Sequence, residues 1–278
     1  MDKKTIYDAM KVFLGFWMKP SEFFESLKEG NSKNNYLTEY FPELERLIGC
    51  KQDPIYHPEG DAWAHTMIVI DEAAKMRCKV RKPEYFMLAA LCHDLGKPDT
   101  FSIDENGKIH TYGHAKAGVP LAKNFLERIG ASEDTVEYVS EMVNHHMDLH
   151  SCFDNKSKIK STNHRFDSVK YPYDLLQLSI ADCYGKQNTE KPNAEEVFLI
   201  ERYNIYEARS REPMVNEDDL TFMGFNPESP EFKEVLASAR KMHFSGVEKT
   251  SAIKDIIAKN RKIIDLVKAN VLIDEFKD

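Results

Sequence analysis

Imidazole and carboxylate side chains are concentrated in one part of the chain. Nine of the ten histidines lie between residues 57 and 164, far more than an even spread over 278 residues would place there. The residues with the most suggestive order are His65, His93-Asp94, His114, His145-His146 and Asp182. Buried imidazoles and carboxylates are costly unless they are paired or bind a metal. Their clustering therefore indicates a site for divalent cations.

The ligand types narrow the kind of ion. Histidine and carboxylate ligands without cysteine suit borderline or hard divalent ions. We therefore expect one or two divalent metal ions, with Fe, Mn, Ni, Co, Zn and Mg as the candidates. The five cysteines are scattered and never form a C-x-x-C pair, which argues against both a zinc ribbon and a disulfide framework.

Several of these residues end apolar stripes of predicted helices. Asp61 is a candidate N-cap, Pro83 suits the first position of a second helix, and Ser132 is a candidate cap for a third. The sets that share a helix face are His65, Ile68, Val69, Ala73 and Met76; Phe86, Ala89, Ala90 and His93; Val136, Val139, Val143 and His146; and Leu175, Leu178 and Asp182. The spacing thus predicts that separate helices deliver the ligands to one core.

The rest of the chain is also predicted to be helical. The aromatic-rich segment 1–48 reads as helices broken at prolines, 193–211 as one helix, and about 250–276 as the last. Ser229-Pro230 opens a further helix as N-cap and first residue. The one strand signal is a short hairpin between Phe101 and Tyr112, turned by Asn106-Gly107. The sequence therefore predicts an all-α fold.

Composition and charge restrict the function. With 42% hydrophobic and 30% charged residues, the chain has the composition of a soluble globular protein. No apolar run is long enough to span a bilayer, so we expect a cytoplasmic protein with no membrane partner. The net charge of −8 disfavours broad DNA binding, and no DNA sequence recognition is expected. The chain lacks the Gly-rich phosphate loops and the G-x-S-x-G elbow.

The pattern H…HD…H…HH…D in a helical chain resembles the HD superfamily of metal-dependent phosphohydrolases, whose core is a helical bundle. Further segments look like the HD-containing part of bacterial CCA-adding enzymes, the tRNA nucleotidyltransferases. These segments, which extend over roughly residues 13–265, are Phe41-Pro42-Glu43-Leu44, Gln52-Asp53-Pro54, His57-Pro58, Asp61, Trp63, His65-Thr66, Leu88 to Pro98, Gly113-His114, Ala181 to Gly185, Asp219 to Phe225 and Phe232 to Leu236.

One departure from that family matters. Its nucleotidyltransferase head carries a Gly-Ser and a D-x-D carboxylate pair, and this chain contains neither. We therefore do not expect nucleotide addition to tRNA. The resemblance predicts an N-terminal helical region at 1–56, an HD phosphohydrolase domain at 57–190, and a C-terminal helical region at 191–278 that is similar to the tail of the CCA-adding enzymes.

The resemblance also implies a ligand set. His65, His93, Asp94 and Asp182 would hold a first metal, and Asp94 would bridge to a second metal. His114 would bind that second metal together with His145 or His146. Helical pitch favours His146, but the resemblance is compatible with either histidine.

The remaining charged side chains have weaker assignments. Lys97, three residues after Asp94, is the first candidate for neutralising phosphate charge. Lys186 and Arg165 are weaker candidates for contacting a phosphate. The other histidines are interpreted as structural (His57, His110, His150) or as surface residues (His164, His243).

The function implied by the resemblance is hydrolysis of phosphate esters. We expect a phosphomonoesterase or cyclic phosphodiesterase acting on nucleotides or RNA ends, in which a metal-activated hydroxide attacks phosphorus. An alternative with the same centre is hydrolysis of dinucleoside polyphosphates or nucleoside triphosphates. A second alternative is a non-catalytic RNA-binding module, suggested by the basic stretch 150–171 and the tail helices.

Overall fold

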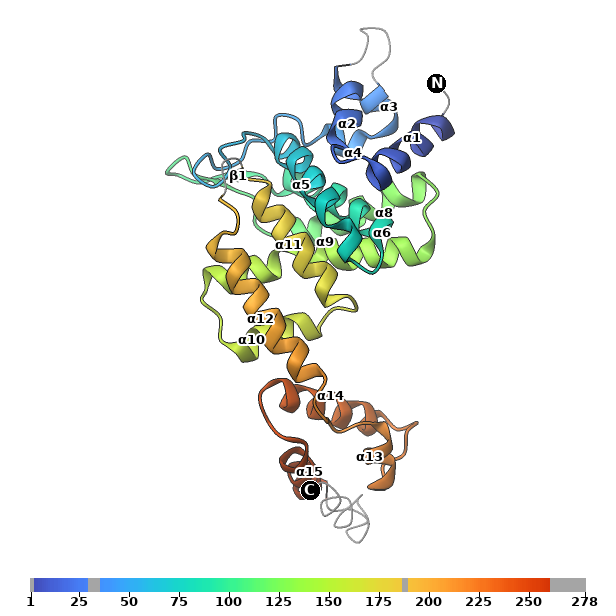
Figure 1. Ribbon diagram of the computed structural model, residues 1–278, viewed down its shortest axis with the longest axis vertical. Helices are drawn as coiled ribbons and strands as arrows, with labels where there is room; N and C mark the ends of the chain where they lie inside the picture. The colour runs from blue at the N-terminus through green and yellow to red at the C-terminus, as the bar shows by residue number, and fades with distance from the viewer. Residues whose placement is uncertain (1–2, 30–35, 187–189, 261–278) are drawn as a thin grey trace. The chain divides into compact units, whose positions relative to one another are not determined.

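The computed structural model describes residues 3–29, 36–186 and 190–260, and it confirms the all-α fold (Figure 1). Contacts divide the chain into two compact units. The first contains residues 1–156 and 169–200, and the second contains residues 157–168 and 201–278. The three regions expected from the sequence remain a prediction.

The first unit begins with four helices that carry the aromatic residues of the N-terminal segment. They are α1 (Lys3–Phe16), α2 (Ser21–Lys28), α3 (Tyr36–Tyr40) and α4 (Pro42–Glu45). Pro20 directly precedes α2 and Pro42 opens α4, as predicted. Phe24 and Phe41 are fully buried and meet edge to face, with ring centroids 6.0 Å apart. This aromatic layer packs on the helices that carry the candidate ligands, because α1 contacts α5 and α6 and α2 contacts α5.

The core of the first unit is a bundle of longer helices. Its members are α5 (Ala62–Met76), α6 (Pro83–Cys92), α8 (His114–Arg128), α9 (Glu133–Asp154) and α11 (Pro172–Tyr184). Helices α5, α6 and α11 pack against one another, α6 and α11 also pack against α9, and α8 lies along α9 (Figure 1). The carboxyl half of α12 (Ala194–Ser210) belongs to the second unit and its amino half to the first.

Local signals predicted where these helices begin. The Asp61 carboxylate accepts a hydrogen bond from the Ala64 amide at 2.9 Å, and the Ser132 hydroxyl accepts one from the Thr135 amide at 3.3 Å. Pro83 is the first residue of α6. Caps satisfy amide groups that have no partner inside the helix, so these residue types mark helix starts.

Helix α5 departs from its predicted amphipathic pattern. Trp63, Thr66 and Met67 are buried although they lie off the predicted apolar face, whereas Ile68 and Met76 are only half-buried. The reason is that α5 lies in the middle of the unit and packs against α2, α6 and α11. A helix surrounded by other helices buries most of its circumference.

Short elements connect the bundle helices. They are the 3-10 helix η1 (Arg77–Lys79), α7 (Lys97–Thr100) and the two strands β1 (Ser102–Ile103) and β2 (Ile109–His110). The strands pair antiparallel, with Ser102 opposite His110, and Gly107 in the turn has a φ of 78°. The predicted hairpin is therefore confirmed.

The second unit has a hydrophobic core of its own. Its helices are α10 (Ile159–Asp167), the end of α12, α13 (Glu217–Phe222), α14 (Pro230–Phe244) and α15 (Lys249–Lys259). Ser229 caps α14 as predicted, accepting from the Phe232 amide at 3.2 Å. The helix predicted for about 250–276 is observed in part as α15, which ends at Lys259, and residues 261–276 of the prediction lie outside the described residues.

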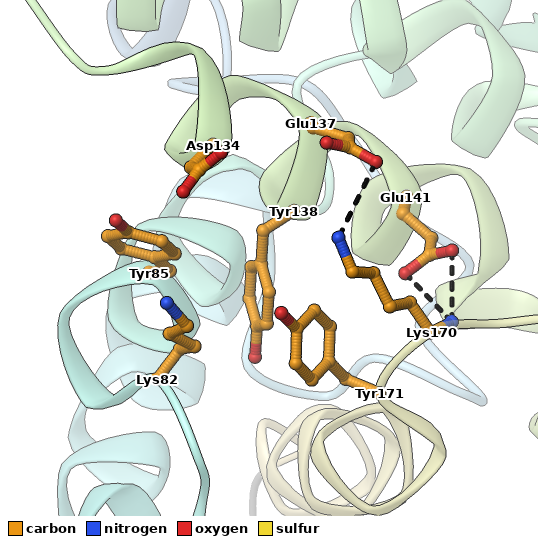
Figure 2. A pocket seen from close by; sticks show the side chains of 8 residues that line it. All are labelled: Lys82, Tyr85, Asp134, Glu137, Tyr138, Glu141, Lys170 and Tyr171. Carbon is orange, nitrogen blue, oxygen red and sulfur yellow. Dashed lines mark hydrogen bonds and ion pairs between the residues drawn. The ribbon is translucent and has the colours of Figure 1, made fainter.

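A small cavity lies where α6, α9 and the start of α11 meet (Figure 2). Its volume of about 30 Å³ has room for about one water molecule. Two lysines of the chain point into it, and Lys170 pairs with Glu137 at 3.9 Å. The rings of Tyr138 and Tyr171 lie side by side, 5.1 Å apart. The cavity is therefore too small for a ligand much larger than a water molecule.

In the described part of the chain, no helix is both long enough and apolar enough to cross a membrane.

Candidate metal centre

Four helices and one connection bring the predicted ligands together. His65 lies on α5, His114 opens α8, His146 lies on α9, and Asp182 lies near the end of α11. His93-Asp94 follows directly after the last residue of α6. All six residues are nearly or completely buried: His65, His93, Asp94, His114, His146 and Asp182.

A first group of possible ligands contains His65, His93 and Asp182. One ligand atom of each residue lies within 4.8 Å of the others. The Nε2 atom of His65 is 2.8 Å from Asp182 Oδ1, and that of His93 is 3.9 Å from the same oxygen. Two imidazole nitrogens therefore converge on one carboxylate oxygen.

A second group contains Asp94, His114 and His146, whose ligand atoms also lie within 4.8 Å of one another. Asp94 Oδ1 is 3.4 Å from His114 Nε2 and 3.8 Å from His146 Nε2. The other oxygen of Asp94, Oδ2, is 3.1 Å from His93 Nε2 in the first group. Asp94 thus lies between the two groups with one oxygen toward each.

The hydrogen bonds of three histidines decide which nitrogen faces this centre. The Nδ1 atoms of His93, His114 and His146 each lie 2.8 Å from a backbone carbonyl three residues earlier. A carbonyl oxygen can only accept, so each Nδ1 carries the proton and donates it. In the neutral imidazole this leaves the Nε2 lone pair for a metal. Among the described residues, His93 Nε2 has no hydrogen-bond partner although it is fully buried.

The charges are arranged to suit a cation. Burial opposes ionisation of Asp94, but the neighbouring His93 and Lys97 hold its pKa well below its usual range. Burial and the neighbouring His114 lower the pKa of His146 to about 3. At neutral pH the carboxylate is therefore ionised and the imidazole neutral, which are the states that bind metal. The donor set fits divalent cations, and it leaves the identity of the metal open.

Residues of this centre line part of a large cavity. The cavity has a volume of about 600 Å³, and Asp94, His114 and Asp182 contribute to its lining. Its size is in the range of sites that hold small organic ligands. The centre is therefore accessible to a substrate larger than inorganic phosphate.

Comparison with protein families and curated proteins agrees with this geometry. The HD domain family matches residues 62–182, a range that contains all six residues. Residues 62–182 form an HD domain. An HD domain implies a metal-dependent phosphohydrolase.

Similar curated proteins carry the name multifunctional CCA protein. That of Actinobacillus pleuropneumoniae serotype 5b (strain L20) is 31% identical over 183 residues, which cover 63% of this chain and 43% of the relative. That of Pasteurella multocida (strain Pm70) is 28% identical over 215 residues, 76% of this chain and 48% of the relative. That of Shewanella denitrificans is 30% identical over 187 residues, which cover 66% of this chain and 43% of the relative. The matched region spans less than half the length of these relatives.

The HD domain brings His146, and not His145, to the second group. His145 Nδ1 lies 2.8 Å from Asp148 Oδ2, and its ring is partly exposed. His145 and His146 are neighbours on a helix and so point about 100° apart, which means that only one can face the core. Which residues bind metal stays a prediction, and the geometry favours His146.

The other predicted phosphate contacts are divided between the two units. Lys97 is buried, with its Nζ 2.6 Å from Asp94 Oδ2 and 2.5 Å from Gln52 Oε1. Lys186 lines the cavity. Arg165 lies on α10, in the second unit, and is not among the described residues that line the cavity.

Sequence reasoning missed two carboxylates that hold histidines of the centre. Glu59 Oε1 lies 2.8 Å from His65 Nδ1 and 2.7 Å from His57 Nδ1. Glu195 Oε1 lies 2.6 Å from the Nδ1 of His150. Both glutamates lie outside any helical stripe of ligands, Glu59 in a loop and Glu195 on α12, so the sequence carries no signal for them.

His150 was interpreted as structural, but it lines the cavity and lies 2.9 Å from Asp182 Oδ2. Burial opposes its charge, yet Asp182 and Glu195 raise the pKa of His150 to about 10. The signal for this contact was its position one helical turn after His146. His243, interpreted as a surface residue, is 2% exposed and lies 2.8 Å from the Arg209 carbonyl, so that interpretation was wrong.

Two glycines allow the close packing that this centre needs. A Cβ on Gly96 would lie 2.1 Å from the His114 carbonyl oxygen, and one on Gly185 would lie 2.7 Å from His65 Cε1. Any larger residue would force α8 or α5 away from the ligands carried by the neighbouring segments.

Proposed function

We propose that this chain is a phosphomonoesterase or cyclic phosphodiesterase that acts on nucleotides or RNA ends. The observation that carries the proposal is the junction of two buried ligand groups at Asp94, on the floor of a cavity large enough for a nucleotide. The coarser class, a metal-dependent phosphohydrolase, follows from the HD domain. The substrate class and the residue roles below are the proposal.

His65, His93 and Asp182 would hold one divalent ion, and His114 and His146 a second, with Asp94 shared between the two. When bound, such ions acidify water and neutralise charge on phosphoryl oxygens. The Nδ1 hydrogen bonds of the histidines fix each ring with Nε2 toward the centre. No nucleophilic side chain is required.

Lys97 would supply an ammonium group next to Asp94. Gln52 holds its Nζ from one side and Asp94 from the other. A fixed, buried cation acts in a low-dielectric environment, so its attraction for a phosphoryl oxygen is stronger than that of a solvated lysine. Lys186, also in the lining, would add positive charge at the cavity wall.

Two considerations favour nucleotides or RNA ends over other phosphate esters. The cavity is far larger than a phosphate group needs, so it can hold the organic part of the ester. The similar curated proteins are named as CCA proteins, and the resemblance to that family implies cyclic phosphates and terminal phosphomonoesters as substrates.

The test is a metal-by-substrate screen of the purified chain. Adenosine 2′,3′-cyclic phosphate, 2′-AMP, 3′-AMP, ATP and diadenosine tetraphosphate are incubated with each of Mn²⁺, Ni²⁺, Co²⁺, Mg²⁺, Zn²⁺ and Fe²⁺. We expect turnover of the cyclic phosphate or the monophosphates, and its loss in Asp94→Asn. Asp99→Asn is the matched control, because Asp99 pairs with Arg46 at the surface.

The outcomes separate the alternatives. Turnover of ATP or diadenosine tetraphosphate alone would replace the proposal by polyphosphate hydrolysis at the same centre. RNA binding without turnover under any of these ions would replace it by a non-catalytic RNA-binding module. Equal turnover by Asp94→Asn and the wild type would show that this centre is not the active site.

A further inference from the structure

Tyr112 is a large aromatic side chain held in the open at the wall of the metal-centre cavity. It lines the cavity, yet 81% of its surface is exposed. Single exposed aromatic residues are common and by themselves indicate nothing. Tyr112 differs because its ring is supported on one side, lies next to the candidate ligands in the chain, and has nothing packed on most of its surface.

The support comes from the preceding strand. The ring of His110 stacks on that of Tyr112, with centroids 4.8 Å apart and an angle of 19° between the planes. His110 is itself fixed by Asp104, whose Oδ2 lies 2.9 Å from its Nε2. Asp104 also accepts hydrogen bonds from the Asn106 and Lys108 amides in the hairpin turn. One face of Tyr112 is therefore pressed against a rigid partner, and the other remains available.

The chain between Tyr112 and the metal centre is short. Only Gly113 separates Tyr112 from His114, and Gly113 has a φ of 81°, a conformation that favours glycine. Two residues span at most about 7 Å. Tyr112 and the candidate ligand His114 therefore lie in one short stretch of the same cavity lining.

A second tyrosine of the cavity lining is less exposed. Tyr56 is 56% exposed, against 81% for Tyr112, and it has the Nζ of Lys108 5.6 Å from its ring centroid in place of a stacked ring. Tyr112 is therefore the aromatic ring of this wall that is best placed to receive another ring.

We propose that Tyr112, backed by His110, is a stacking platform for the base of the substrate, so that the enzyme selects nucleotides over phosphate esters that lack a base. The inference rests on the proposed function, because it uses the same cavity for the phosphate. Every base has a flat π-face, and stacking on an aromatic side chain contributes to binding without reading a particular sequence. The platform therefore selects for the presence of a base and tolerates different bases.

The experiment compares two substrates with the same reacting group. One is adenosine 2′,3′-cyclic phosphate, and the other is the 2′,3′-cyclic phosphate of 1-O-methylribose, which has no base. The quantity measured is the ratio of their kcat/KM values, with the metal that gives the highest activity. We expect Tyr112→Ala to lower this ratio by about tenfold or more and Tyr112→Phe to preserve it. Phe16→Ala is the matched control, because Phe16 is 78% exposed and does not line the cavity.

A second measurement keeps the inference independent of turnover. The dissociation constants of 5′-AMP and ribose 5-phosphate are determined by calorimetry in the presence of Mn²⁺. We expect Tyr112→Ala to weaken the binding of 5′-AMP by about tenfold while changing that of ribose 5-phosphate much less.

The two ideas fail in different ways. If the wild type hydrolyses neither the cyclic phosphates nor 2′-AMP and 3′-AMP, but Tyr112→Ala still loses selective binding of 5′-AMP, the proposed function is wrong and the platform stands. If Tyr112→Ala lowers kcat/KM by the same factor for both cyclic phosphates, or for neither, the platform is overturned and the proposed function is unaffected.

Discussion

The Nε2 atoms of His114 and His146 lie 3.0 Å apart, although each histidine donates its Nδ1 proton to a backbone carbonyl. With both rings neutral, two lone pairs therefore face each other beside the Asp94 carboxylate. Such an arrangement is unfavourable without a positive charge between the nitrogens, and a divalent ion supplies one.

The first prediction concerns the two adjacent histidines of α9. His146→Gln should lower the amount of metal bound per chain, because it removes a candidate ligand of the second group, whereas His145→Gln should not. Elemental analysis after dialysis measures the difference. Removing the metal with a chelator should lower the melting temperature of the wild type, because an ion that binds only the folded state stabilises it. Equal metal content in the two variants would contradict the assignment.

The second prediction concerns the carboxylate behind His65. Glu59 accepts hydrogen bonds from His65 and His57. Burial by itself would raise the pKa of Glu59, but these two hydrogen bonds lower it below its ordinary value. Such a partner fixes the ring of a ligating histidine and makes it more basic, so Glu59→Gln should weaken metal binding by about 10- to 100-fold. Titration with Mn²⁺ measures this. Glu127→Gln, on the exposed side of α8, should bind as the wild type does.

The third prediction concerns Lys97. Lys97→Met keeps most of the side-chain volume but removes the cation beside Asp94. We expect kcat to fall by about 10²-fold, the typical effect of losing one group that stabilises developing charge. The metal content should remain, since Lys97 is not a ligand. Lys123→Met is the control, because Lys123 is exposed on the surface of α8. An unchanged kcat in Lys97→Met would exclude Lys97 from the reaction.

The fourth prediction concerns packing against α5. A Cβ at Gly185 would lie 2.4 Å from Val69 Cγ2 and 2.7 Å from His65 Cε1. Gly185→Ala should therefore cost about 1–3 kcal/mol of unfolding free energy and also weaken metal binding. Gly15→Ala meets no atom within 4 Å and should leave stability unchanged or raise it. Urea unfolding compares the two, and equal stabilities would show that α5 and α11 can separate without cost.

The fifth prediction concerns the small cavity of Figure 2. The hydroxyl of Tyr138, which lines this cavity, donates to the fully buried Asp174 at 2.7 Å. Burial raises the pKa of Asp174, and the Tyr138 hydrogen bond opposes that rise by stabilising the ionised form. Tyr138→Phe should therefore cost about 1–3 kcal/mol at pH 7.

The effect of Tyr138→Phe should depend on pH. The lost hydrogen bond stabilises the carboxylate, so the cost is largest where Asp174 is ionised and shrinks as pH falls through its raised folded-state pKa. Urea unfolding at pH 7 and pH 4 measures this. Tyr85→Phe, in the same cavity, should show little change at either pH. A cost of Tyr138→Phe that grows toward pH 4 would contradict the expected direction.

Local features of the fold were accessible from the sequence. Asp61, Ser132 and Ser229 were recognised as helix caps because a cap is an interaction between residues two or three positions apart. The hairpin was recognised from Asn106-Gly107 for the same reason. The pattern of α5 failed because its burial depends on three other helices, which no periodicity within 15 residues can reveal.

The sequence by itself determined the helical class, the starts of α5, α6, α9 and α14, and the set of histidines and acids from which a metal centre could be built. Only the tertiary structure decided the partners within that set. In it, His146 rather than His145 lies near Asp94, and Glu59 accepts a hydrogen bond from His65. Tyr112 remains exposed in the lining of the cavity. The physical reason is range. Caps and periodicity act between near neighbours in the chain, whereas the contact of His65 with Asp182 joins residues 117 positions apart and exists only once the helices pack.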